Sequence, residues 1–126
     1  MAREIVFTPN AAKPPPAYSQ AVKAAGLVFV SGTAPTDPTT GAIKGATIQE
    51  QTRQCLTNIR AILEAAGTSL ANLVKTTVFL QNLDDFAGMN EVYSKHVGER
   101  PPARSTVEVA KLPSGALVEI EAIALI

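Results

Sequence analysis

The sequence predicts a single α+β domain, residues 1–126, in which two helices cover one face of a mixed six-stranded sheet. Three observations predict this fold: short segments that alternate with period two, two longer segments with helical periodicity, and their order along the chain, βββ-α-β-α-ββ. Strands joined through a helix require parallel crossovers, and right-handed crossovers place both helices on the same side of the sheet. The opposite face is then left uncovered, and its aliphatic side chains favour self-association.

Three strands are predicted before the first helix. Residues 3–7 alternate weakly, residues 18–23 follow the stiff stretch Lys13-Pro14-Pro15-Pro16, and residues 27–31 form an apolar run. A turn at Ala25-Gly26 separates the second and third strands. The next segment, up to Gly45, is rich in glycine and proline and is predicted to be an ordered surface loop.

The first helix is predicted over residues 48–66. Thr47 and Glu50 have the spacing of a capping box, and Gly67 ends the helical pattern. The apolar residues of one face are Ile48, Cys55, Leu56, Ile59, Ile62, Leu63 and Ala66. This stripe predicts that the helix packs against the sheet.

The second half of the chain continues with a strand, a helix and two strands. Period-two alternation marks residues 74–81, 104–109 and 117–126, and a turn at 112–115 separates the last two strands. The helix begins near Leu83 and ends at Gly98, before Pro101-Pro102. Its predicted inward residues are Phe86, Met89, Tyr93 and Val97.

Composition excludes several classes of protein. Eleven basic residues balance eleven acidic ones, so no overall positive field attracts nucleic acid or anionic lipid. One cysteine and one histidine cannot form an internal disulfide or a Cys/His zinc site, and no metal is expected. The apolar runs 24–30 and 120–126 are too short to span a membrane, and the N-terminus lacks the apolar region of a signal peptide. We expect a soluble, cytoplasmic protein.

Glu119 is a candidate for proton transfer. By the period-two rule it shares a strand face with Leu117, Glu121, Ile123 and Leu125. A carboxylate among aliphatic side chains is costly unless it is paired, and desolvation would raise its pKa toward a value useful for proton transfer. The alternative is an ordinary solvated glutamate on a strand.

Arg104 and Tyr18 are candidates for binding a ligand. Arg104 follows Pro101-Pro102-Ala103, and its planar guanidinium at the start of a strand fits a carboxylate through two parallel hydrogen bonds. A surface arginine paired with an acid is the alternative. Tyr18 either offers its hydroxyl at a cleft or packs as an aromatic residue of an edge strand.

Other residues have ordinary structural explanations. Cys55 lies on the apolar stripe of the first helix, which favours burial, and His96 at a helix end is expected to be partly solvated. Gly32 ends a buried strand, where glycine permits either close approach by a ligand or a turn. Gly41 and Gly45 do not form a phosphate loop, because the Lys-Ser/Thr step of that motif is missing.

A composite signature extends over nearly the whole chain. Its segments are Tyr18-Ser19-Gln20-Ala21, Val30-Ser31-Gly32, Asp37-Pro38 to Gly41, Ala65-Ala66-Gly67, Val74 to Leu80, Phe86 to Tyr93, Pro102-Ala103-Arg104-Ser105, Val107-Glu108-Val109-Ala110, Leu112-Pro113 and Val118 to Ala124. Together these segments resemble the RidA (YjgF) family, the reactive intermediate deaminases, also called the L-PSP endoribonuclease family.

The resemblance implies a chorismate-mutase-like fold and a homotrimer whose sheets form an inner barrel, with ligand clefts at the subunit interfaces. Such a trimer would cover the open sheet face. The resemblance also implies hydrolysis of reactive 2-imino acids, such as 2-iminopropanoate and 2-iminobutanoate, to 2-keto acids and ammonia, without a cofactor or metal.

The resemblance also assigns roles to particular residues. Arg104 matches the family arginine that binds the substrate carboxylate, and Glu119 matches the glutamate thought to position or activate water. Tyr18 matches a tyrosine that lines the cleft, Gly32 a glycine whose backbone lies near the ligand, and Asn90 an asparagine of the second helix near the pocket.

Position 106 departs from the family pattern. Many deaminase members have cysteine there, whereas this chain has Thr106, which is counted with the substrate-binding residues. A contact through the backbone would survive this change, but a contact that depends on a thiol would not. Thr106 therefore keeps open a related deaminase subfamily that acts on larger substrates, such as 2-aminomuconate.

Two further functions stay open. One is a noncatalytic or chaperone-like trimer that binds small carboxylates in the same clefts. The other is RNA cleavage or translation inhibition, which has been attached to members of the family. Zero net charge, the lack of a Lys/Arg cluster and the lack of an aromatic platform argue against RNA as the principal ligand.

Overall fold

The computed structural model describes residues 2–126, so Met1, the first residue of the predicted domain, lies outside the described residues. The elements along the chain are β1 (Glu4–Val6), β2 (Ala21–Ala24), β3 (Leu27–Thr33), α1 (Ile48–Ala65), β4 (Leu73–Leu80), α2 (Phe86–Val97), β5 (Ala103–Glu108) and β6 (Val118–Leu125). Short 3₁₀ helices occupy Leu70–Asn72, Leu83–Asp85 and Pro113–Gly115. The predicted order βββ-α-β-α-ββ is confirmed.

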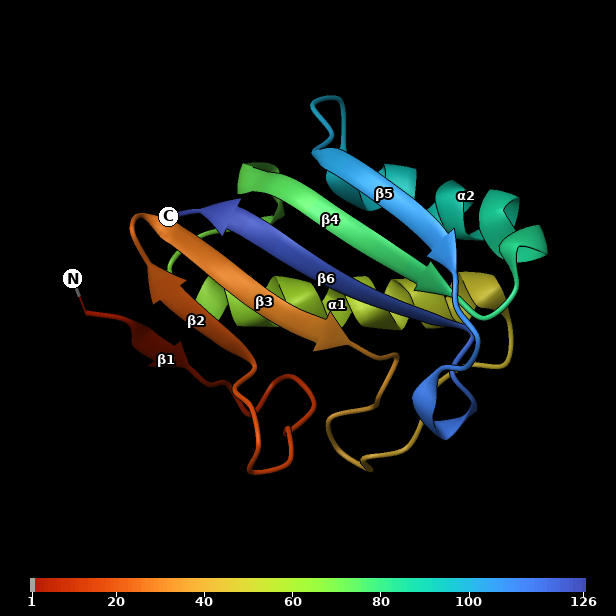
Figure 1. Cartoon of the computed structure of the whole chain (residues 1–126), viewed down its shortest axis with the longest axis horizontal. Coiled ribbons are helices and arrows are strands. Elements are labelled where there is room, and N and C mark those ends of the chain that lie inside the picture. Colours follow the sequence, from red (N-terminus) through yellow and green to blue (C-terminus); the bar gives the residue numbers. More distant parts are fainter. Residues whose placement is uncertain (1) are drawn as a thin grey trace.

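These residues form one mixed sheet of six strands in the order β1-β2-β3-β6-β4-β5. β6, the last strand along the chain, lies between β3 and β4 and is antiparallel to both. β4 and β5 are parallel, and α2 forms the crossover between them. Both helices lie on one side of the sheet, as predicted (Figure 1).

Thr47 caps the N-terminus of α1, at the position that the capping-box spacing predicts. The hydroxyl of Thr47 accepts a hydrogen bond from the backbone N–H of Glu50 at 3.1 Å and donates one to the Glu50 carboxylate at 2.9 Å. These bonds satisfy a backbone donor that would otherwise lack a partner in the first turn. The helix ends at Ala65 with Ala66 as its cap, one residue short of the predicted boundary.

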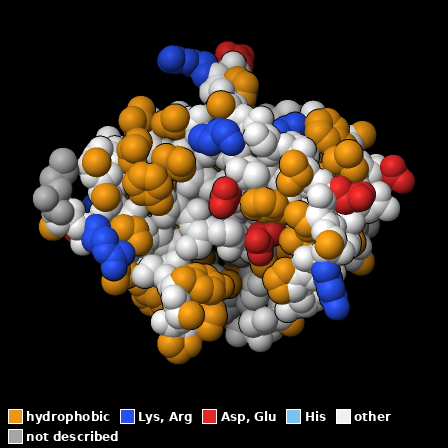
Figure 2. Space-filling model, in the orientation of Figure 1, with side chains coloured by type: hydrophobic (Ala, Val, Ile, Leu, Met, Phe, Trp, Pro, Cys, Tyr) orange, Lys and Arg blue, Asp and Glu red, His pale blue; other side chains and the backbone are white. Residues whose placement is uncertain are grey.

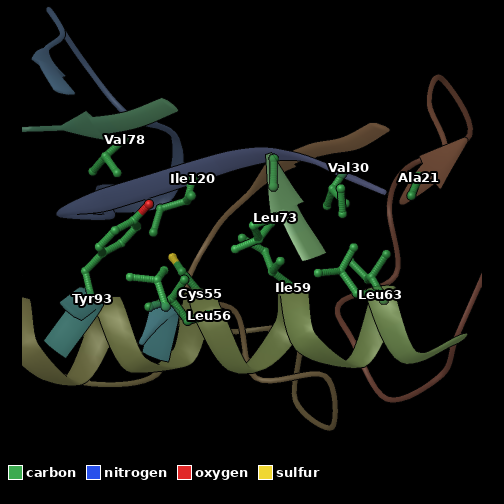
Figure 3. Packing of buried hydrophobic residues seen from close by; sticks show 14 of the residues in the cluster. Ala21, Val30, Cys55, Leu56, Ile59, Leu63, Leu73, Val78, Tyr93 and Ile120 are labelled. Carbon is green, nitrogen blue, oxygen red and sulfur yellow. The ribbon is translucent and has the colours of Figure 1, made fainter. Parts of the chain in front are cut away.

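The core lies between the sheet and the helices. In Figure 3, Leu56, Ile59 and Leu63 point from α1 toward the sheet, from which Val78 and Ile120 point back. All five of these side chains are fully buried. Burial alternates along β6, with its even-numbered residues in the core, so its odd-numbered residues face away from the helices.

The opposite face of the sheet is open and partly apolar. Phe29, Val74, Val107 and Leu125 are each more than 40% exposed. Figure 2 views the molecule from this side and shows groups of hydrophobic side chains, with acidic side chains near the middle. The predicted uncovered apolar face is therefore confirmed for the single chain.

Two register shifts interrupt the pairing of β6 with its neighbours. In β3, two residues, Ser31 and Gly32, lie opposite Glu121 alone, because Val30 pairs with Ala122 and Thr33 pairs with Ile120. In β4, the shift falls at Val74. The period-two alternation predicted over residues 74–81 puts Val74 on the same face as Thr76, which is wrong, because Val74 is the extra residue of the bulge and is exposed while Thr76 is buried.

Two other predictions need correction. Tyr18 is not part of a strand: it lies in a turn after Pro15, and β2 begins only at Ala21. The side-chain amide of Gln20 fixes this segment as a loop through hydrogen bonds to backbone groups of residues 8–12. Phe86, predicted to point inward, is 39% exposed because it is the first residue of α2 and lies beside Arg104.

The loop after β3 is ordered, as predicted, although its first two predicted residues belong to the strand. The Asn58 side-chain amide of α1 donates to the carbonyl oxygens of Ala34 and Thr36 at 3.2 and 2.9 Å. The loop is therefore attached to the helix layer at its beginning. Among residues 2–126, neither helix is long and apolar enough to cross a membrane.

Replacing Thr47 tests how much the cap of α1 stabilises the fold. We expect Thr47→Ala to lower the free energy of unfolding by about 0.5–2 kcal/mol, because a backbone donor loses its partner. Urea denaturation at fixed protein concentration measures the loss. Thr47→Ser keeps the hydroxyl and serves as the control, so equal stability of the two variants would contradict the assignment.

Candidate functional site

The predicted site residues form two groups on opposite faces of the sheet. Arg104 of β5 lies opposite Thr76 of the neighbouring strand β4, and residues opposite each other in neighbouring strands share a face of the sheet. Thr76 is buried beneath α2, so Arg104 lies on the helix side. Glu119 belongs to the odd-numbered residues of β6 and lies on the open side. The cavities beside Arg104 and Glu119 have no lining residue in common.

Arg104 is held by side chains of α2. Its Nη1 donates a hydrogen bond of 2.7 Å to Oδ1 of Asn90. The guanidinium carbon lies 4.7 Å from the ring centre of Tyr93 and 5.4 Å from that of Phe86, within the range of cation–π attraction. Asn90 therefore contacts Arg104 itself, which the sequence did not predict.

Tyr93 is in turn fixed from below. Its hydroxyl lies 2.6 Å from the hydroxyl of Thr76 on β4, and both side chains are buried. A buried hydroxyl pair holds the ring in place because neither group can find a partner elsewhere without a cost. Phe86, Asn90 and Tyr93 have the spacing i, i+4, i+7, which places them along one side of α2. That spacing was the available signal for this group: Phe86 and Tyr93 were predicted only as inward residues of the helix, and the resemblance alone placed Asn90 near the pocket.

The guanidinium of Arg104 has no carboxylate partner in the described chain. Within residues 2–126 the one ion pair joins Lys23 to Glu4. The alternative of a surface arginine paired with an acid is therefore wrong. A cavity of about 390 Å³ lies beside the guanidinium, lined by Asn90, Tyr93, Ser94, Val97, Gly98, Pro101, Pro102 and Arg104.

Glu119 lies in a second, shallower cavity on the open face. Its lining consists of Tyr18, Ser31, Gly32, Glu119 and Glu121. The bulge in β3 brings Ser31 and Gly32 to this side together, because two residues occupy the place of one. Three of the predicted residues, Tyr18, Gly32 and Glu119, are therefore brought together.

The environment of Glu119 disfavours its charged form. Burial against the sheet raises the pKa of its carboxyl group above the ordinary value, and the nearby charge of Glu121 raises it further. This direction agrees with the expectation from the apolar face. A glutamate with a raised pKa is a stronger base than an ordinary one, although it also takes up a proton at a higher pH.

The remaining candidates lie apart from these two cavities. Thr106 is half-buried on the same side of β5 as Arg104, opposite Val78, but its side chain lines neither cavity. Cys55 is fully buried, as predicted, and burial raises the pKa of its thiol. Within residues 2–126, no three His, Cys, Asp or Glu side chains are grouped so that they could hold a metal ion.

Sequence comparison places this α+β architecture among known proteins. The sequence model of the family Endoribonuclease L-PSP matches residues 8–126. A RutC family protein of Pyrococcus horikoshii is 55% identical over 122 residues, which cover 97% of both chains. Reactive Intermediate Deaminase A, chloroplastic, of Arabidopsis thaliana is 44% identical over 97% of this chain and 65% of its own.

Solved structures share the fold over nearly their whole length. RidA from an Antarctic Psychrobacter is 43% identical with a TM-score of 0.93, covering 98% of this chain and 99% of that one. TdcF of Escherichia coli, whose structure contains bound serine, is 42% identical with a TM-score of 0.90, covering 98% of both chains.

The chain is therefore an α+β protein of the chorismate-mutase-like class, in which two helices cover one face of a mixed sheet. It belongs to the Endoribonuclease L-PSP family, whose members are also called RutC, RidA and YjgF proteins.

Neutralising Glu121 tests the electrostatic part of the Glu119 environment. We expect Glu121→Gln to lower the pKa of Glu119, because removing a neighbouring negative charge makes ionisation easier. Carboxyl ¹³C NMR across a pH titration measures this pKa directly. Burial is the larger cause, so the pKa of Glu119 in the variant should stay above the ordinary value; an unchanged pKa would show that Glu121 does not act on Glu119.

Proposed function

We propose that the protein hydrolyses small 2-imino acids to 2-keto acids and ammonia, with Arg104 binding the substrate carboxylate and Glu119 activating water. The observation that carries this proposal is the guanidinium of Arg104. Asn90 and Tyr93 hold it in one orientation beside a cavity, and no carboxylate of the described chain neutralises it. A fixed guanidinium of this kind matches a ligand carboxylate, which it binds through two parallel hydrogen bonds.

Two relatives support the same class of ligand. TdcF of Escherichia coli has been crystallised with serine, an amino acid whose carboxylate is attached as in a 2-imino acid. The Arabidopsis relative is named as a reactive intermediate deaminase. Both names come from proteins more than 40% identical to this chain. They favour a small carboxylate over a macromolecule as the ligand.

The proposed reaction needs little chemistry from the protein. An imine carbon is already electrophilic, so the protein must orient the substrate and supply an activated water molecule. The imine reacts in its protonated form: the carboxylate of Glu119 takes a proton from water as the water oxygen bonds to the imine carbon, and the C=N electron pair moves to nitrogen, which gives a neutral tetrahedral aminoalcohol. Glu119 then returns the proton to the nitrogen, which leaves as ammonia with the electron pair of the C–N bond. As the C=O bond forms, the Glu119 carboxylate takes the hydroxyl proton and releases it to water.

A site of this kind requires more than one copy of the chain. Arg104 and Glu119 lie on opposite sides of the same sheet, in separate cavities. One small substrate therefore cannot contact both residues of a single chain. We propose that the open sheet faces associate in a homotrimer and that Arg104 of one subunit meets Glu119 of a neighbour in a cleft between them. Association also removes the exposed apolar side chains from water.

RNA cleavage, which the family name suggests, is less well supported. The chain carries no net charge, and phosphate binding depends on an excess of basic residues. We therefore propose a small 2-imino or 2-keto acid as the ligand. Larger imines are the alternative substrates, because this chain has Thr106 where many deaminase members have cysteine.

Imine hydrolysis can be measured with a threonine dehydratase that generates 2-iminobutanoate while semicarbazide competes for the imine. We expect wild-type protein to accelerate keto-acid release. Arg104→Ala should lose about 2–5 kcal/mol of binding to the substrate carboxylate. Glu119→Gln should lower turnover by about 10²–10⁴-fold.

The control for these variants is Arg60→Ala, because Arg60 is an exposed arginine on α1. It should behave as wild type. No acceleration by folded wild-type protein would overturn the proposed reaction, and near-wild-type turnover in Glu119→Gln would remove Glu119 from the mechanism.

Mixing two inactive variants tests whether the site is shared between subunits. When Arg104→Ala and Glu119→Gln chains are unfolded together and refolded in equal amounts, about a quarter of the clefts should receive both intact residues, so part of the activity should return. A mixture of Arg104→Ala with the double variant is the control and should stay inactive. If the first mixture also stays inactive although mixed oligomers form, both residues act within one chain.

A further inference from the structure

The backbone conformation at position 32 does not require glycine. The φ of Gly32 does not lie in the left-handed region, which glycine adopts more readily than other residues, and this residue belongs to the extended strand β3. What excludes a side chain is the neighbouring strand. A Cβ atom at position 32 would lie 2.8 Å from Oε2 and 3.2 Å from Cδ of Glu119.

The bulge in β3 creates this close approach. In an unbroken strand, neighbouring residues point to opposite faces, but Ser31 and Gly32 both line the cavity of Glu119 because they share one place opposite Glu121. The second of these two positions faces the Glu119 carboxylate. The missing side chain therefore leaves a space that the carboxylate occupies against the backbone of β3.

We propose that Gly32 is a positioning residue for Glu119: the space left by its missing side chain seats the carboxylate at the orientation in which it activates water. The catalytic step itself rests on the proposed function. The space beside Gly32 that holds the Glu119 carboxylate, called the seat below, does not, because it follows from the packing of β3 against β6.

The seat also accounts for part of the electrostatics. A carboxylate that lies against a strand backbone is partly withdrawn from water, and burial is the main cause of the raised pKa of Glu119. A methyl group at position 32 would move the end of this flexible side chain outward, toward the open cavity. More water would then reach the carboxylate, so its pKa should fall toward the ordinary value.

Gly32→Ala tests the seat by filling it. The fold should persist, because the added methyl group meets the end of a flexible side chain rather than a backbone atom. We expect kcat for imine hydrolysis to fall by about 10²-fold, the usual effect of misplacing a catalytic group by about 1 Å. The NMR pKa of Glu119 should fall as well. A pKa equal to that of wild type would overturn the proposal.

A double-mutant cycle separates seating from simple blockage of the cleft. In the Glu119→Gln background, Gly32→Ala should cause little further loss of kcat, because the group on which it acts is already absent. If Gly32→Ala lowers kcat by the same factor in both backgrounds, the methyl group blocks the substrate and the proposal is wrong.

Gly88→Ala is the matched control. Like Gly32, Gly88 has a φ outside the left-handed region, and an added Cβ atom would be too close to a neighbouring side chain, 2.7 Å from Cγ2 of Ile48. Gly88 differs in its location, because it lies on α2 and faces α1. It should change stability while leaving the pKa of Glu119 unchanged. If wild-type protein shows no imine hydrolysis but Gly32→Ala still lowers the pKa of Glu119, the proposed function fails and the seat stands.

Discussion

The central position of β6 is the constraint on which the rest of the structure depends. This strand hydrogen-bonds to β3 on one side and to β4 on the other, and its even-numbered side chains enter the core under α1. Because a strand alternates its side chains with period two, the same burial that holds Ile120 in the core turns Glu119 and Glu121 outward. The position of the acidic residues is therefore a consequence of core packing.

The two charged groups of the candidate site are supported in different ways. Arg104 receives a hydrogen bond acceptor and two aromatic rings from α2, and the buried hydroxyl pair of Thr76 and Tyr93 fixes one of those rings. Glu119 instead occupies the space that Gly32 leaves beside β3. Burial there and the nearby charge of Glu121 raise its pKa. The cation is therefore held by direct contacts in one orientation, whereas the carboxylate is left with a shifted proton affinity, which suits binding and proton transfer respectively.

Much of the fold follows from local sequence signals. The alternation of β6, the Thr47 cap of α1 and the order of the elements are all determined by neighbouring residues, and the structure confirms them. The wrong predictions, at Tyr18, Val74 and Phe86, concern positions set by bulges, turns and packing with distant segments. The same holds for the site: the sequence identified Arg104 and Glu119 individually, but the cross-strand pairing of β5 with β4 decides that they lie on different faces. Periodicity within one segment carries no information about such pairing.

The chain order of the sheet has a consequence for protein synthesis. The central strand is the last of the six to emerge from the ribosome, so the strands made earlier form two separate groups, β1-β2-β3 and β4-β5, that cannot join until β6 arrives. Until then β3 and β4 each present an unpaired edge, and such edges are sites of aggregation. A messenger truncated before the codon for Val118 would therefore yield two incomplete half-sheets with exposed edges, which are substrates for chaperones and proteases, rather than a weakened form of the native protein.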